Sequence, residues 1–266
     1  MMDVKERVEG KGEGCKMEVK LIEKSGNEMR FLVTNLSVSL ANALRRAILT
    51  LVNVAAIEDV TIYKNTSSMY DEVLALRLGL IPLKTVPTDK KSSKKIRFLL
   101  KEVGPKIVHA SDMKVEDPDF APVYDKTIIM ELKRGEEIDL EAEAAYGNGL
   151  DHAKFVPAHV FYHFYPIIDI KDSDVKNAKE IAKKCPVNIL EAEGGKLSVK
   201  KGSIDKCILC KACEDFAGKD VIEISSDPKK IIFEIESWGQ LSVKDIIDEA
   251  VSGLNSELDM IEEKVL

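Results

Sequence analysis

Residues 40–51 read LANALRRAILTL, and this stretch predicts an amphipathic α-helix near the start of the 266-residue chain. Its apolar residues recur at intervals of three and four, which is the spacing of one helix face. They are Leu40, Ala43, Leu44, Ala47, Ile48 and Leu51. Ser39 stands at the expected N-cap. The opposite face carries Asn42, Arg45 and Arg46, so the helix is apolar on one side and cationic on the other.

Alternating and β-branched stretches on both sides of this helix predict strands. Residues 16–33 alternate as a hairpin around a turn at 25–27, and residues 55–64 are expected to form a strand. A short helix is expected over residues 71–80. Further strands are expected at 96–100, 107–109, 127–132, 138–144, 160–165 and 231–235. Separate helices and short strands together predict an α+β fold.

The strongest helical pattern lies at residues 243–265, the last part of the given sequence. Its apolar stripe consists of Val243, Ile246, Ile247, Ala250, Val251, Leu254, Leu258, Ile261 and Val265. Ser242 with Asp245 resembles a capping box at the start of this helix. The stripe is either intramolecular core or a surface for a partner helix from another chain, and the pattern alone favours neither.

Four cysteines have spacings that suit an iron–sulfur cluster. Cys207, Cys210 and Cys213 follow the pattern Cys-x2-Cys-x2-Cys, and Cys185 precedes a proline. Bacterial ferredoxins carry the run Cys-x2-Cys-x2-Cys-x3-Cys-Pro twice, and the last cysteine of each run ligates the other run's cluster. Three ligands of the second run and the last ligand of the first are present here. They form a complete set for one [4Fe-4S] cluster.

The ligand positions of a second cluster are apolar. Counting back along the first run reaches Ile181, Ala178 and Val175, and the fourth missing ligand falls on Ala217. These small or branched side chains predict ordinary packing where a ferredoxin would hold its other cluster.

Other uses of the cysteines fit less well. Zinc also takes four thiolates, but structural zinc sites usually draw them from two separated Cys-x2-4-Cys pairs. A degraded [3Fe-4S] cluster is a further alternative. Disulfides are not expected, because residues 1–14 lack the apolar core of a signal peptide and an intracellular compartment keeps thiols reduced. Cys15 has no partner at ligand spacing and is interpreted as incidental.

Composition and motifs limit the classes of function. A net charge of -7, with 45% hydrophobic and 32% charged residues, is typical of a soluble globular protein of one to three domains. No apolar run is long enough to cross a bilayer, so no membrane partner is expected. The acidic balance argues against a free-standing duplex binder, because phosphate contacts come mostly from clustered Lys and Arg. The basic run at 90–95 is interpreted as a solvated loop.

The sequence offers no active site of its own. It lacks the Gly-rich phosphate loops, His-Glu-x-x-His and Gly-x-Ser-x-Gly. His159 and His163 share one strand face but have no carboxylate cluster nearby in sequence, so they are interpreted as packing or surface residues. Direct catalysis is not expected.

Two long strings, residues 40–49 and YDEVLALRLGLIPL at 70–83, resemble the archaeal RNA polymerase D subunit family. This family is the counterpart of bacterial alpha and of the eukaryotic third-largest subunit. Residues 149–157 and 234–239 extend the similarity to essentially everything after the leader. An iron–sulfur insertion is a trait of some archaeal members.

The resemblance implies a domain plan. After a flexible leader it implies a discontinuous alpha-like dimerisation domain, a strand-rich insert domain and a ferredoxin-like iron–sulfur domain. The expected bounds are 1–15 for the leader, 16–55 with 157–170 and 228–266 for the dimerisation domain, 56–156 for the insert domain, and 171–227 for the ferredoxin-like domain.

The resemblance also implies partners. The terminal stripe would pack against the small subunit L and form an alpha-like heterodimer. The residues expected at that interface are Ile247, Val251, Leu254 and Leu258. The heterodimer would recruit the small subunits N and P and then the two large catalytic subunits. Asn42, Arg45 and Arg46 would lie near the second-largest subunit, where guanidinium groups suit bidentate contacts.

Two functions follow as hypotheses. The first is a cytoplasmic, non-catalytic assembly subunit of archaeal DNA-directed RNA polymerase, a nucleotidyltransferase complex, with no sequence-specific DNA contact of its own. The alternative is a ferredoxin-type electron carrier, which accounts only for the cysteine segment. A regulatory hypothesis lies between them: losing the cluster would loosen the small third domain and thereby modulate polymerase assembly.

Overall fold

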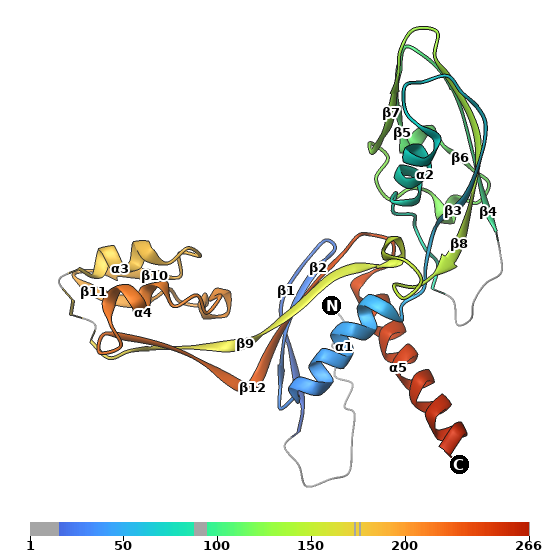
Figure 1. Ribbon diagram of the computed structural model, residues 1–266. Helices are drawn as coiled ribbons and strands as arrows, with labels where there is room; N and C mark the ends of the chain where they lie inside the picture. Colours follow the sequence, from blue (N-terminus) through green and yellow to red (C-terminus); the bar gives the residue numbers. More distant parts are fainter. Residues whose placement is uncertain (1–15, 88–94, 173, 176, 266) are drawn as a thin grey trace, which may run out of the picture. The chain divides into compact units, whose positions relative to one another are not determined.

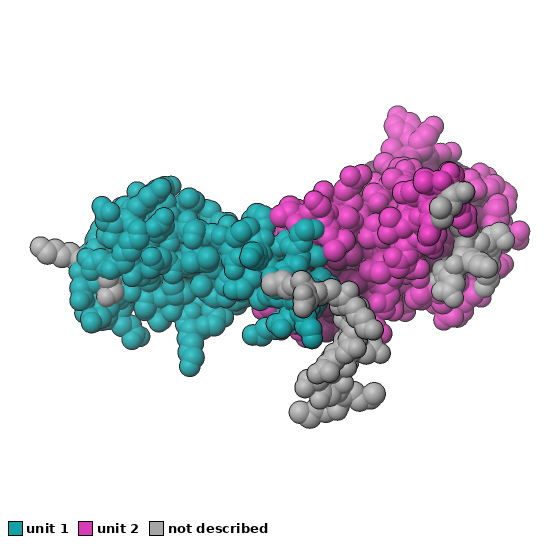
Figure 2. Space-filling view, turned by 90° about the horizontal axis from the view of Figure 1, so that it is seen from below, with its two compact units in different colours: residues 1–20, 32–37, 164–232 teal, residues 21–31, 38–163, 233–266 magenta. Residues whose placement is uncertain are grey.

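The computed structural model describes residues 16–87, 95–172, 174–175 and 177–265 (Figure 1). The predicted leader, Cys15 and most of the basic run at 90–95 lie outside the described residues. The chain divides into two compact units, which Figure 2 colours separately. Among the described residues, unit 1 comprises those within 16–20, 32–37 and 164–232, and unit 2 those within 21–31, 38–163 and 233–265.

One four-stranded sheet has the strand order β1-β2-β12-β9. Its strands are β1 Glu18–Ser25, β2 Glu28–Thr34, β9 Ala158–Ile170 and β12 Ile222–Ser237. Each of these strands has residues in both units. β1 and β2 form the predicted hairpin, and Gly26 supplies the positive φ of 54° at its turn.

Two helices of unit 2, α1 (Val38–Thr50) and α5 (Val243–Val265), pack against each other (Figure 1). Their buried residues are Ala41, Ala47, Ile48, Val243, Ile246 and Ala250. Gly253 makes the close approach possible, because a Cβ added there would lie 2.9 Å from the Cβ of Leu51. The apolar stripes found in the sequence therefore meet over part of their length.

The two helices begin in different ways. α1 begins at Val38, so the prediction of Ser39 as N-cap is wrong. The residue that directly precedes the helix is another serine, Ser37. The periodicity of apolar residues does not fix a helix boundary to within one residue. At the start of α5, the Asp245 N–H donates to Ser242 Oγ at 3.2 Å. The Ser242 hydroxyl in turn donates to Asp245 Oδ2 at 2.6 Å. In a capping box the backbone N–H of the cap residue donates to this carboxylate, whereas here the donor is the hydroxyl.

The middle of the chain folds within unit 2 around a second four-stranded sheet, ordered β3-β8-β4-β6, and the pair β5-β7. The elements are β3 Val54–Asn65, α2 Asp71–Gly79, β4 Ile96–Val103, β5 Lys106–His109, β6 Lys114–Val115, β7 Ile128–Leu132 and β8 Glu137–Gly147. Leu74 and Leu78 of α2 join Phe98 and Leu140 of the sheet in one buried core. All the strands and the helix predicted for this region are confirmed.

Unit 1 contains the cysteine segment. Between β9 and β12 the chain forms α3 Ala178–Lys184, β10 Leu190–Glu193, β11 Lys196–Val199 and α4 Ala212–Ala217. The element order is strand, helix, strand, strand, helix, strand, and β10 pairs with β11. Short helices and one strand pair thus make up the segment that carries the four cysteines. The predicted strand at 231–235 is only the last part of β12, which begins at Ile222 and continues through Pro228.

In the described part of the chain, four single 3-10 turns connect these elements, at Ala110–Asp112, Pro118–Phe120, Ala153–Phe155 and Ile204–Lys206. Among the residues that the structure describes, no helix has both the length and the apolar character needed to cross a membrane.

Candidate cysteine site and exposed helix faces

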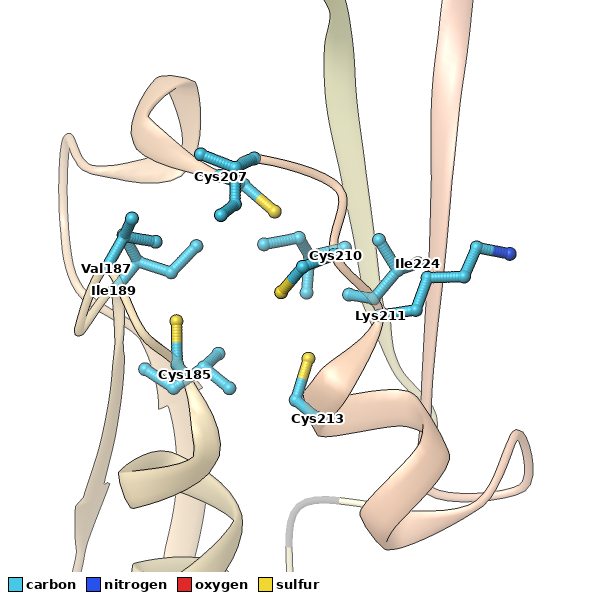
Figure 3. Close-up of a pocket in the computed structure, with 11 residues that line it drawn as sticks. Cys185, Val187, Ile189, Cys207, Cys210, Lys211, Cys213 and Ile224 are labelled. Atoms are coloured by element: carbon cyan, nitrogen blue, oxygen red, sulfur yellow. The ribbon is translucent and has the colours of Figure 1, made fainter.

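The four cysteines come from the ends of short elements in unit 1. Cys185 follows α3, Cys207 follows the turn at Ile204–Lys206, and Cys213 lies in the first turn of α4. Figure 3 shows the four sulfur atoms, including that of Cys210, directed into one shared space. All four are free thiols, as expected from the sequence. The fold therefore brings together residues that are up to 28 positions apart, from 185 to 213.

The cysteines differ in exposure. Cys207 and Cys213 are buried, at 7% and 8% exposure, Cys185 is half-buried and Cys210 is exposed. Apolar side chains form most of the remaining wall, among them Ile168 of β9. The others are Val187, Ile189, Leu190, Ile208 and Ile224. One corner of the site thus faces solvent and the rest is apolar.

The loop around Cys210 has an unusual backbone. Leu209 and Lys211, one on each side, have positive φ values of 56° and 59°. Side chains other than glycine rarely adopt this conformation, and such residues cluster at functional sites. Backbone amides also point at the sulfurs: the Leu209 N–H bonds to Cys207, and the Glu214 N–H bonds to Cys213. The loop therefore presents both thiols and amide donors to the shared space.

Burial raises the pKa of the Cys207 and Cys213 thiols above the ordinary value, and the neighbouring cysteines raise it further. The amide hydrogen bonds act in the opposite direction but are smaller in effect. Cys207 and Cys213 therefore keep their thiol protons more strongly than an ordinary cysteine. A metal that binds as a thiolate complex must displace these protons, which makes its binding dependent on pH.

The donor set fits an iron–sulfur cluster by its chemistry. Four thiolates in an apolar wall, with amide N–H groups aimed at the sulfurs, are the surroundings that such clusters use. The cavity is about 10 Å³, which is room for about one water molecule. An eight-atom [4Fe-4S] core is larger than this space, so it is the chemistry of the donor set, and not the volume of the cavity, that fits a cluster.

Within the described residues, no three or more His, Cys, Asp or Glu side chains are close enough together to hold a single metal ion. A zinc ion bound to four thiolates at about 2.3 Å draws all the sulfurs toward one centre. In a cube each thiolate binds a different iron, so the sulfurs surround the cluster without converging on one ion. The cysteine ligand set stays a prediction.

The four positions that would ligate a second cluster are filled by packed apolar side chains, as predicted. Ala178 and Ile181 are buried in the core of unit 1, at 2% and 0% exposure, and Val175 and Ala217 pack against that core. The prediction that these four positions are ordinary packing is confirmed. The absence of a second cluster stays a prediction.

The polar face of α1 is only partly free. Arg45 donates from Nε and Nη2 to Asn42 Oδ1 at 3.2 and 3.0 Å, and both residues are half-buried. Arg46 is exposed. Leu40, on the apolar face of the same helix, is 51% exposed. The structure thus leaves Arg46 accessible and ties Arg45 to its own helix; the role of all three polar residues stays a prediction.

The stripe of α5 is covered only at its N-terminal end. Val243, Ile246 and Ala250 are buried against the rest of unit 2. Farther along, Ile247 and Leu254 are half-buried, whereas Val251 is 43% exposed and Leu258 62% exposed. Ile261 and Val265 are exposed as well, at 59% and 79%. The first half of the stripe is intramolecular core, and the second half is an uncovered apolar surface in the described chain.

The histidines lie at ordinary positions. His163 Nε2 is 3.3 Å from Glu234 Oε1, and the His159 ring lies 5.5 Å from that of Phe161. Both residues are on β9, where the sequence placed them on one face. Their interpretation as packing or surface residues agrees with these contacts.

Two features of the molecule were not predicted from the sequence. Val19 and Leu21 of β1 are 63% and 55% exposed, so the edge strand adds apolar surface that alternation alone could have indicated. Glu214 is 4% exposed beside Cys213. Nothing in the sequence separates this carboxylate from the many surface glutamates.

Comparisons with known proteins cover nearly the whole chain. Residues 30–258 match the family model described as the RNA polymerase Rpb3/Rpb11 dimerisation domain. Three similar proteins are named DNA-directed RNA polymerase subunit Rpo3. That of Methanosphaera stadtmanae is 36% identical over 92% of this chain and 97% of its own length. Those of Methanobrevibacter smithii and Pyrococcus furiosus are each 34% identical over 91% of this chain, and over 96% and 95% of their own lengths.

Proposed function

The chain belongs to the RNA polymerase Rpb3/Rpb11 dimerisation family, and from this membership we propose that it is a non-catalytic assembly subunit of archaeal DNA-directed RNA polymerase. The observation that carries the proposal is the extent of the similarity, which spans 91% to 92% of the chain in the three relatives above. The nucleotidyltransferase activity belongs to the complex. This chain contributes its surfaces.

The first of those surfaces is the uncovered half of α5. We propose that the small subunit L covers Val251, Leu254 and Leu258, with Ile247 at the edge of the contact, to form an alpha-like heterodimer. The support is physical: a continuous run of apolar side chains along a helix is costly to leave in water and resembles half of a domain core. The exposed Leu40 on α1 extends the same kind of surface.

Later steps of assembly need other surfaces. In the proposal the heterodimer recruits the small subunits N and P and then the two large catalytic subunits, and the exposed Arg46 contacts the second-largest subunit. An accessible guanidinium suits a carboxylate or carbonyl partner, which it can bind with two parallel hydrogen bonds. Assembly of this kind takes place in the cytoplasm, which is the proposed location.

We further propose that Cys185, Cys207, Cys210 and Cys213 hold one [4Fe-4S] cluster. When bound, such a cluster supplies four covalent cross-links and a one-electron redox centre. The chain's own residues supply the thiols, the apolar wall and the amide donors. Because unit 1 has a small core, the cross-links would stabilise the fold around α3 and α4.

The electron-carrier alternative is not favoured. It uses only the cysteine segment, whereas the similarity to polymerase subunits includes α1, α2 and α5 as well. A carrier also needs rapid electron exchange with a donor. Slow or absent exchange with an intact cluster would indicate a structural role for it.

Expression with and without subunit L tests the proposed function. Alone, the chain is expected to aggregate through its uncovered helix faces; with L, it is expected to form a stable heterodimer with a raised melting temperature. A well-behaved monomer with no affinity for L would overturn the assembly proposal. Iron and zinc counts on anaerobically purified protein test the cluster separately, and zinc without iron would overturn that part alone.

A further inference from the structure

Glu214 is a buried carboxylate next to the cysteine site. It belongs to α4, directly follows Cys213 and is 4% exposed. Burying a carboxyl group without hydrogen bonds costs free energy, so a buried glutamate normally has specific partners. Its nearest cation, Lys211 Nζ, is 3.9 Å away and 53% exposed, which makes it a weak partner.

The strong partner of Glu214 is a backbone amide of another element. The N–H of Ile224, in β12, donates to Glu214 Oε2 at 2.6 Å in a fully buried hydrogen bond. A glutamate in the first turn of a helix commonly folds back onto the backbone of that helix. Glu214 instead reaches across to the strand, so its carboxylate joins α4 to β12.

Both ends of this connection also belong to the cysteine site. The backbone N–H of Glu214 bonds to the Cys213 sulfur, and the side chain of Ile224 forms part of the wall around the four thiols. Ile224 is 2% exposed. Any displacement of Cys213 therefore acts on the N–H of Ile224 through a single residue.

We infer that Glu214 is a positioning residue that couples the iron–sulfur site to the first part of β12. With the cluster bound, Cys213 is fixed and Glu214 holds the Ile224 amide; without it, α4 loosens and the amide is released. β12 runs on to Ser237, shortly before α5, so the coupling acts on the strand that precedes the proposed partner-binding helix. The inference rests on the proposed cluster.

The test is amide hydrogen exchange at Ile224 in the full chain co-purified with subunit L, before and after iron removal by a chelator. In the wild type, iron removal is expected to accelerate exchange at Ile224 about 10- to 100-fold, the range for a hydrogen bond to a charged group. In Glu214→Ala, exchange is fast in both states, so the iron-dependent difference disappears. Glu214→Gln keeps a side-chain oxygen acceptor and is expected to restore part of the difference.

Coupling is reciprocal, which gives a second readout. Glu214→Ala should hold the cluster more weakly than the wild type, by about the same factor as its loss of iron-dependent protection at Ile224, as measured by the chelator concentration that removes half of the visible absorption at equilibrium. Glu223→Gln is the matched control, because Glu223 precedes Ile224, is 44% exposed and pairs with Lys171 at 2.6 Å. It should leave both measurements unchanged.

The outcomes separate the two proposals. An iron-dependent difference at Ile224 that persists in Glu214→Ala overturns the coupling while leaving the cluster intact. A wild-type chain that takes up no iron under anaerobic reconstitution with Fe²⁺ and sulfide overturns the cluster, and the coupling with it. Loss of the difference in Glu214→Ala, with recovery in Glu214→Gln, supports the inference.

Discussion

Truncation of Leu258 to alanine separates folding from partner binding on the α5 stripe. Leu258 is 62% exposed in the chain alone, so its side chain contributes little to the fold. Covering the exposed part with subunit L would remove that apolar surface from water. Full burial of a leucine side chain is worth about 1.5–3 kcal/mol, and the exposed share of it amounts to about 0.9–1.9 kcal/mol.

This free energy converts directly into affinity. At about 1.4 kcal/mol per factor of ten, Leu258→Ala should weaken binding to subunit L about 5- to 25-fold. The same change should lower the free energy of unfolding of the isolated chain by less than about 0.5 kcal/mol, as at other surface positions. Titration with L and urea denaturation of the isolated chain, both at concentrations below the onset of its aggregation, measure the two quantities.

Two controls make the comparison sharp. Ile246 is on the same helix but 0% exposed, so Ile246→Ala should cost the isolated chain about 2–5 kcal/mol of unfolding free energy. Asp259→Ala, next to Leu258 and exposed, should change neither quantity. A role for Leu258 in binding is refuted if Leu258→Ala leaves the affinity for L unchanged, or if it destabilises the isolated chain as much as Ile246→Ala.

Three further changes probe the cysteine site, the α1 terminus and the cationic face. Cys210→Ser should abolish visible absorption and weaken recruitment of the large subunits, while L binding measured by titration stays largely intact. Gly149→Ala should destabilise the chain by about 1–3 kcal/mol in a thermal or urea melt, because its Cβ would clash with the Leu49 carbonyl oxygen. Arg46→Glu should retain L binding but weaken pull-down of the second-largest subunit at least about tenfold.

Each of these expectations has a contrary result. Equal assembly by Cys210→Ser would remove the regulatory hypothesis without affecting the scaffold. A melt of Gly149→Ala that matches the wild type would mean that the loop at 147–157 moves freely away from α1. Undiminished recovery of the large subunit with Arg46→Glu would place that contact elsewhere on the chain.

Local patterns predicted the elements of the fold well. The alternation in β8 and the three- and four-residue spacing in α5 correspond to burial on one face, so these elements were visible in the sequence. Boundaries were less visible. Ser37 and Ser39 are equally good caps by type. Pro228 cannot donate to a strand ladder, so nothing in the sequence indicated that the strand extends back through it to Ile222, where β12 begins.

The candidate site was predicted only in part. The cysteine spacing indicated which residues share a site, because cluster ligands require that spacing. The sequence did not predict which part of the α5 stripe is covered by the chain itself. Ala250 and Leu258 belong to the same periodic stripe, but only Ala250 is buried against the rest of unit 2. Glu214 was missed because its burial depends on how α4 meets β12, a tertiary contact that leaves no local pattern.

In the proposed function, this chain works inside a larger assembly through apolar helix faces that it does not cover itself. An anaerobic pull-down of the chain at its native expression level tests this proposal. The quantities to measure are the mass and the metal content of the complex that is recovered. We expect a polymerase-sized complex that contains subunit L and the large catalytic subunits, with about four irons per copy of this chain. Recovery of the chain alone, as a stable monomer, would contradict the proposal.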